Sequence, residues 1–145
     1  MPFQPLSPVL HSIDFRLSYG DCDPAGIIYF AAYYQWMERV YGEWTYLGEF
    51  QASVMRDLWG STHISRASGC EYFVPAVLFD AVTCEMRVAR VGDTSFTMAF
   101  DFIRRTDSTR LAQGHMVLVF IDEDTRPGPV PEGFKSILRA AGADW

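Results

Sequence analysis

Residues 19–40 read YGDCDPAGIIYFAAYYQWMERV, and this stretch decides the fold. Its first half is a loop of glycine, aspartate and proline, and its second half has the period of a helix. Apolar side chains recur at spacings of three and four residues at positions 30, 33, 37, 40, 44 and 47. This stripe predicts one long helix that begins near Phe30 and stops at Gly48. The stripe is broad, so we expect other elements to enclose the helix.

Strand patterns lie on both sides of this helix. Alternating apolar and polar residues predict strands within 12–19, 82–88, 96–102 and 110–121, and residues 61–74 look extended. Short helices are expected at 50–58 and near the end of the chain. Brief turns at 92–93 and 106–109 make neighbouring strands antiparallel. We therefore expect one α+β domain over residues 1–145, with a curved antiparallel sheet wrapped around one long central helix and a loose lead-in at 1–11.

Composition excludes several classes of partner. The net charge is −6 and no run of Lys and Arg exists, which disfavours nucleic acid. No apolar run approaches the roughly 20 residues that span a bilayer, so no membrane partner is expected. The opening residues do not resemble a secretory signal, which favours a cytoplasmic location. Three scattered histidines and three cysteines lack metal-site spacing, so neither a metal nor a separate cofactor is predicted.

The loop at 19–26 combines carboxylates with an uncapped helix start. Asp21 and Asp23 lie two residues apart, and Pro24 restricts Asp23 to extended conformations. Residues 28–30 offer no side chain that could cap the helix, so its first N–H groups need other partners. Such groups polarise a thioester carbonyl, and a nearby carboxylate can attack that carbonyl or activate water. The plainer alternative is a loop whose carboxylates only stabilise turns.

The run from Tyr19 to Val40, with its G-D-x-D-x-x-G motif, resembles the start of the 4-hydroxybenzoyl-CoA thioesterase family of hotdog-fold proteins. The resemblance implies a hotdog fold and an acyl-CoA thioesterase. It makes Asp23 the catalytic carboxylate, as nucleophile or as general base, and makes the backbone N–H of Phe30 the donor to the thioester oxygen. It also implies a homodimer or homotetramer with active sites at the subunit interface. Apolar residues on a second sheet face, at 117, 119 and 121, favour an oligomer as well.

Further residues are predicted to bind substrate. Gly26 lets the backbone approach a ligand, and Ala31 stands where many relatives have proline, which affects the shape of the acyl pocket. Tyr29 and Tyr33 are expected to line a pocket for an aromatic, hydroxybenzoyl-like, or short acyl group. His63 is expected to line the pocket or carry a proton, unless it is an ordinary loop histidine. Candidate partners for the CoA phosphates are the arginines at 87, 90, 104, 105 and 126.

Two other functions remain open at this point. A non-catalytic acyl-CoA-binding module would bind the thioester without releasing CoA, although binding alone does not require the carboxylate of Asp23. A hydratase-type hotdog enzyme is disfavoured, because no histidine lies between Ser12 and Thr62 to pair with the carboxylate. The sequence does not distinguish a CoA thioester from one carried by a protein.

Overall fold

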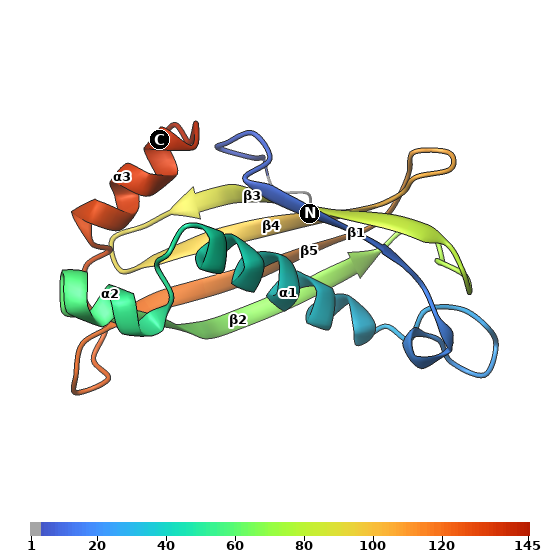
Figure 1. Ribbon diagram of the computed structural model, residues 1–145, viewed down its shortest axis with the longest axis horizontal. Helices are drawn as coiled ribbons and strands as arrows, with labels where there is room; N and C mark the ends of the chain where they lie inside the picture. Colours follow the sequence, from blue (N-terminus) through green and yellow to red (C-terminus); the bar gives the residue numbers. More distant parts are fainter. Residues whose placement is uncertain (1–3) are drawn as a thin grey trace.

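A computed structural model describes residues 4–145. In chain order, its elements are β1 (His11–Arg16), η1 (Tyr19–Asp21), α1 (Ala32–Leu47), α2 (Ala52–Trp59), β2 (Thr62–Tyr72), β3 (Ala81–Val91), β4 (Ser95–Arg104), β5 (Thr109–Ile121) and α3 (Glu132–Ala140). The described strands form one antiparallel sheet in the order β1-β3-β4-β5-β2. Helix α1 lies across one face of this sheet (Figure 1). The predicted α+β hotdog fold is therefore confirmed.

Helix α1 has the predicted apolar stripe. Tyr33, Met37 and Val40 are almost fully buried against the sheet. The helix begins at Ala32, two residues later than expected, because the Ala32 N–H donates to the carbonyl oxygen of Tyr29 in a preceding turn (2.8 Å). It ends as predicted at Gly48, whose N–H donates to the Trp44 carbonyl oxygen (3.0 Å).

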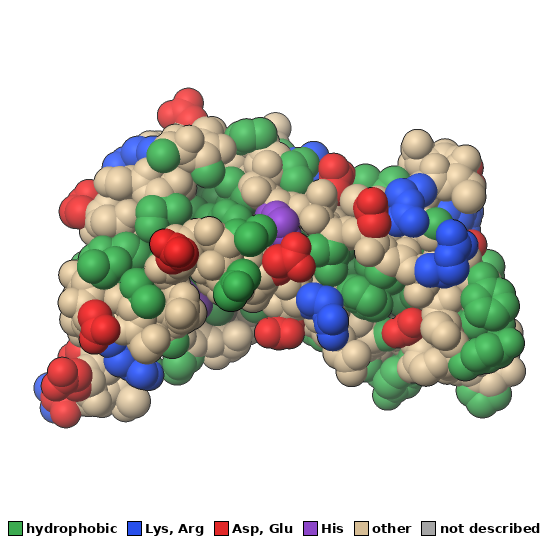
Figure 2. All heavy atoms as spheres, in the orientation of Figure 1, with side chains coloured by type: hydrophobic (Ala, Val, Ile, Leu, Met, Phe, Trp, Pro, Cys, Tyr) green, Lys and Arg blue, Asp and Glu red, His purple; other side chains and the backbone are tan. Residues whose placement is uncertain are grey.

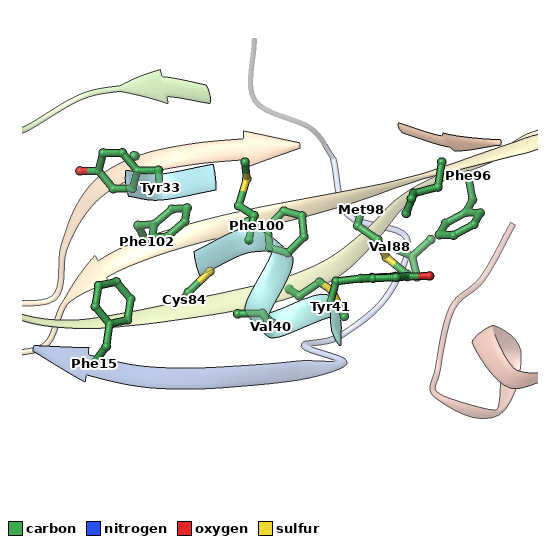
Figure 3. Packing of buried hydrophobic residues seen from close by; sticks show 14 of the residues in the cluster. Phe15, Tyr33, Val40, Tyr41, Cys84, Val88, Phe96, Met98, Phe100 and Phe102 are labelled. Atoms are coloured by element: carbon green, nitrogen blue, oxygen red, sulfur yellow. The ribbon is translucent and has the colours of Figure 1, made fainter. Parts of the chain in front are cut away.

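The core lies between α1 and the inner face of the sheet. Strand β4 contributes Phe96, Met98, Phe100 and Phe102, all of them buried (Figure 3). These are the alternating positions that the sequence marked as apolar, so the predicted inward face of this strand is confirmed, although Thr97 and Ala99 on its other face are buried as well. Burial of such large side chains is the main source of stability, at about 25 cal/mol for each Å² of apolar surface removed from water.

Two apolar side chains on the outer face of β5 are already buried within one chain, whereas the sequence suggested that a second subunit would bury them. Val119 and Ile121 are each only 8% exposed within one chain. Residues after β5 fold back, so that Pro127 pairs with Ile121 in an isolated bridge. These two side chains therefore do not by themselves require an oligomer.

The two ends of the sheet differ. Helices α2 and α3 gather at one end, while the loop before α1 occupies the other (Figure 1). Part of the predicted lead-in, residues 1–3, lies outside the described residues. Its remainder is fixed, in contrast to the loose segment expected: the N–H groups of Leu6 and Leu10 donate to the carbonyls of Val88 and Met86 in β3, at 2.7 and 2.8 Å.

Candidate active site

Asp23 sits at the tip of a small hairpin. The hairpin pairs Cys22 with Ile28, and the Asp23 N–H donates to the Ile27 carbonyl oxygen (2.9 Å). Its own carbonyl accepts the Gly26 N–H (3.0 Å), and Gly26 completes the turn with a φ of +77°. Left-handed backbone of this kind favours glycine, because a Cβ would meet the following carbonyl. The GDCDPAG motif thus folds as a tight, internally bonded turn.

The carboxylate of Asp23 is only partly engaged by this turn. Its Oδ1 accepts the Ala25 N–H at 2.8 Å. Its Oδ2 has no hydrogen-bond partner among residues 4–145, and the side chain is half-buried. Asp21 behaves differently, since its Oδ2 accepts the Ser18 N–H (2.9 Å) and its carbonyl accepts the Tyr29 N–H (2.8 Å). Asp21 therefore stabilises the loop by hydrogen bonds, whereas Asp23 has one carboxylate oxygen free to contact a ligand.

Backbone donors lie free where the hairpin leads into α1. Ala31 occupies the cap position and supplies no side-chain hydrogen bond to the helix. Within the described chain, the N–H groups of Phe30 and Ala31 have no acceptor. The positive end of the helix dipole adds to their attraction for an oxygen that carries negative charge. The uncapped helix start predicted from the sequence is present.

A cavity of about 270 Å³ opens beside these donors. It lies between the start of α1 and the chain that follows β2, and is lined by Ile27, Ile28, Phe30, Tyr33, Tyr72, Phe73, Val74 and Pro75. Its wall is apolar and largely aromatic. Asp23 is not part of this wall, but its hairpin leads to it. The Asp23 N–H bonds the Ile27 carbonyl oxygen and Cys22 pairs with Ile28, and both isoleucines line the cavity.

The structure brings some predicted site residues together and leaves others apart. Phe30 and Tyr33 line the cavity, while Gly26 shapes the adjoining turn. Tyr29 and Ala31 do not line it: Tyr29 is 50% exposed and its ring packs beside that of Phe30, with 4.8 Å between centroids. Apolar side chains gather over this end of the molecule (Figure 2).

His63 lies away from this group. It is the second residue of β2, whereas Tyr72 at the cavity is the last, so about 30 Å of strand separates them. The His63 ring packs edge-on against Phe96, Phe120 and Phe134 and is hydrogen-bonded to the Tyr41 hydroxyl. Burial among these rings lowers the pKa of His63 to about 4.

The wall formed by Tyr72 to Pro75 was not assigned to the site from the sequence. Two hydrogen bonds hold this wall in place, because the N–H groups of Phe73 and Val74 both donate to the Leu111 carbonyl oxygen, at 2.8 and 3.1 Å. The available signal was a pair of aromatic residues, Tyr72 and Phe73, shortly before Pro75. That signal does not reveal which helix end the pair will face.

Of the five candidate arginines, two lie at each end of the sheet and one lies in its middle. Arg104 is the last residue of β4 and Arg105 follows it, at the end of the sheet where the loop of residues 19–29 lies. Arg104 bonds Asp80 and Asp107, and Arg105 bonds Asp14. Arg87 is paired with Asp101 in the middle of the sheet. Arg90 and Arg126 lie toward the opposite end and have no acidic partner within the described residues. Position therefore favours Arg104 and Arg105 over the other three as neighbours of a ligand at Phe30.

Comparisons with known proteins place this geometry in a wider group. Residues 17–138 match the profile described as the Thioesterase-like superfamily. No curated protein matches the sequence at a significant level. Across residues 4–145, no helix is both long and apolar enough to cross a bilayer.

Solved structures share the fold at low identity. A 1,4-dihydroxy-2-naphthoyl-CoA thioesterase from Synechocystis superposes with a TM-score of 0.78 at 15% identity, covering 89% of this chain and 95% of its own. A gentisyl-coenzyme A thioesterase gives 0.70 at 24%, covering 86% and 98%. The dynemicin thioesterase, which binds a polyene, gives 0.72 at 20%, covering 90% and 95%.

Proposed function

Because the chain belongs to the thioesterase-like superfamily and is thus a thioester hydrolase, we propose that it hydrolyses an acyl-CoA with Asp23 as its catalytic carboxylate. One juxtaposition carries the proposal. The free Oδ2 of Asp23 and the unpaired N–H groups of Phe30 and Ala31 belong to one hairpin and the helix start that follows it. A carbonyl held by the donors would have a carboxylate within the same loop.

The chemistry assigned to these groups is ordinary acyl transfer. The Phe30 N–H would hold the thioester oxygen and stabilise the oxyanion that forms there. As general base, Asp23 would take a proton from water while the water oxygen bonds the carbonyl carbon; the C–S bond then breaks, and the CoA thiolate leaves and takes up the proton. As nucleophile, Asp23 would form a mixed anhydride, which water cleaves after CoA has left. Both routes end in a free acid and CoA.

The cavity favours a compact acyl group. Its volume of about 270 Å³ lies just below the range of about 300–1,000 Å³ typical of sites for drug-sized ligands. An aromatic wall suits an aryl ring or a short chain better than a long flexible one. Two of the structural neighbours are named for hydroxylated aromatic CoA thioesters, which supports the aryl alternative.

The proposal includes a homo-oligomer and a cytoplasmic location. Tyr19, Tyr29, Phe30 and Phe79 leave half or more of their side-chain surface exposed around the catalytic loop. A second copy that covers these rings would exclude water from the reacting carbonyl and would strengthen its interaction with the N–H donors. Coenzyme A would belong to the substrate, and no separate cofactor is proposed.

A thiol-release screen tests the proposed function. The wild-type protein is offered benzoyl-, acetyl-, hexanoyl- and palmitoyl-CoA, and free CoA is measured with a thiol reagent. We expect turnover of the benzoyl or the shorter acyl groups and little turnover of palmitoyl-CoA. Tight binding of acyl-CoA without release of CoA from any of them would overturn the proposal and favour a binding module.

A further inference from the structure

The cavity contains two phenol hydroxyls in an otherwise apolar wall. Of its lining side chains, only Tyr33 and Tyr72 carry a polar atom within the described residues. Their rings lie 5.5 Å apart, centroid to centroid, and are inclined by 33°. Isolated polar groups in an apolar pocket are what fixes a ligand's orientation and determines specificity.

The Tyr33 hydroxyl has no hydrogen-bond partner in the described part of the chain, although the residue is only 2% exposed. Buried hydroxyls almost always have partners. No buried side-chain oxygen or nitrogen in residues 4–145 is sealed away without one, so this hydroxyl must reach open space. The cavity is the open space that Tyr33 lines, and Figure 3 shows the hydroxyl directed away from the neighbouring core side chains.

The ring of Tyr33 is held in place by its neighbours. It meets Phe102 edge to face at 4.7 Å and packs beside Tyr72. Burial raises the pKa of Tyr33 well above its ordinary value, so the hydroxyl stays neutral and can both donate and accept a hydrogen bond. A fixed, neutral hydroxyl of this kind has no competing protein acceptor.

The second hydroxyl is already engaged. The Tyr72 hydroxyl lies 3.5 Å from the carbonyl oxygen of Phe30, the residue whose N–H is the proposed oxyanion donor. Burial is the main cause that raises the pKa of Tyr72 to about 12, with the Cys70 thiol beside it adding to the effect. Tyr72 therefore connects the end of β2 to the start of α1, and Tyr33 alone faces the cavity without a partner.

We propose that Tyr33 determines specificity: its hydroxyl bonds a polar atom on the acyl group, so that compact acyl groups bearing an oxygen are hydrolysed in preference to hydrocarbon groups of the same shape. This inference rests on the proposed thioesterase function. An unsubstituted ring would fill the cavity but would leave the Tyr33 hydroxyl unpaired in an apolar, closed site. The unpaired hydroxyl raises the free energy of the complex with the hydrocarbon substrate, and the enzyme therefore discriminates against that substrate.

Matched substrate pairs test the proposal. We compare kcat/KM for 3- and 4-hydroxybenzoyl-CoA with the 3- and 4-methylbenzoyl-CoA of equal shape. The wild type should favour the hydroxyl member at one ring position by about tenfold or more, and Tyr33→Phe should lower that ratio by about tenfold. Tyr46→Phe is the matched control, because Tyr46 lies on the same helix and is 74% exposed; it should leave the ratio unchanged.

Three results would overturn the assignment of Tyr33. These are an unchanged ratio in Tyr33→Phe, a wild-type preference for the methyl member at both positions, or a ratio that falls only in Tyr72→Phe. Each presupposes that acyl-CoA is hydrolysed, so they are distinct from a failure of the proposed function, in which the wild type releases no CoA from any substrate. A near-UV circular dichroism spectrum confirms that each variant is folded, and a purely structural role for Tyr33 would lower turnover of both members of a pair equally.

Discussion

At the scale of single residues, the two glycines of the proposed catalytic loop, residues 19–29, have different tasks. A Cβ at Gly20 or at Gly26 would meet no atom within 4 Å, so neither position is closed by sterics. Only Gly26 has a left-handed backbone, with φ at +77°. The sequence motif shows both glycines but cannot show which of them carries the unusual backbone angle, because that angle depends on how the hairpin closes.

Substitution by alanine should separate the two glycines. Gly26→Ala places a side chain in left-handed backbone, at a cost of roughly 1 kcal/mol, and should displace Asp23 and lower kcat. Gly20→Ala should change both stability and kcat little. Chemical denaturation and CoA-release assays measure these effects. Equal losses in the two variants would contradict the account of the hairpin.

At the scale of elements, the sequence predicted what local periodicity encodes. The stripe of α1 and the alternation of β4 depend on neighbouring residues, and both elements were predicted correctly. The burial differs in part, because Leu47 of the stripe is exposed, and Thr97 and Ala99 on the other face of β4 are buried. The wall from Tyr72 to Pro75 depends on where the end of β2 meets α1, and a single sequence does not encode that meeting locally. Tyr19 shows the same limit: it fits the alternation of the first strand, but the strand ends at Arg16 and Tyr19 lies in η1.

His63 in β2 is hydrogen-bonded to Tyr41 in α1 inside an aromatic cluster. This contact between two elements predicts how the stability of the fold depends on pH. Its folded pKa of about 4 lies below the unfolded value of about 6.5. Between these pH values the unfolded chain binds a proton that the folded chain does not. This contribution to stability is therefore complete above about pH 6.5 and is lost as the pH falls toward 4, by up to about 3 kcal/mol.

Urea unfolding at several pH values between 4.5 and 7 measures this effect. Carboxylates also titrate there, so the comparison is with His63→Gln, which keeps a polar side chain near Tyr41 but has no proton to bind. The variant should lose less stability than the wild type as the pH falls. Identical pH dependence in the two proteins would show that His63 is not buried in its neutral form.

At the scale of the whole molecule, the sheet has an open edge along β2, the strand whose last residue lines the proposed site. Strand β2 pairs only with β5 within the described residues, and residues 64–68 along its length are exposed. An unpaired strand edge invites a second strand. The predicted homo-oligomer remains a proposal, and this edge together with the exposed rings around the proposed catalytic loop supports it.

A charge on this edge should weaken assembly. Ala67→Lys places like charges near one another if two β2 strands meet about a two-fold axis, and should raise the dimer dissociation constant about tenfold or more. Ser53→Lys, on the exposed side of α2, is the control and should have no effect. Sedimentation velocity over a range of concentrations gives the mass relative to the 16.5 kDa chain. A wild type that is monomeric throughout, yet fully active, would contradict this part of the proposal.

The central claim is that Asp23 acts on a carbonyl held by the free N–H groups at the start of α1. Its most direct test is the kcat of Asp23→Asn on the best acyl-CoA, measured together with the affinity of that variant for the substrate; Asp57→Asn, an exposed aspartate of α2, is the control. We predict that kcat falls by about 10²–10⁴-fold in Asp23→Asn while binding and fold persist, and that Asp57→Asn keeps wild-type turnover. An Asp23→Asn protein that releases CoA at the wild-type rate would contradict the account.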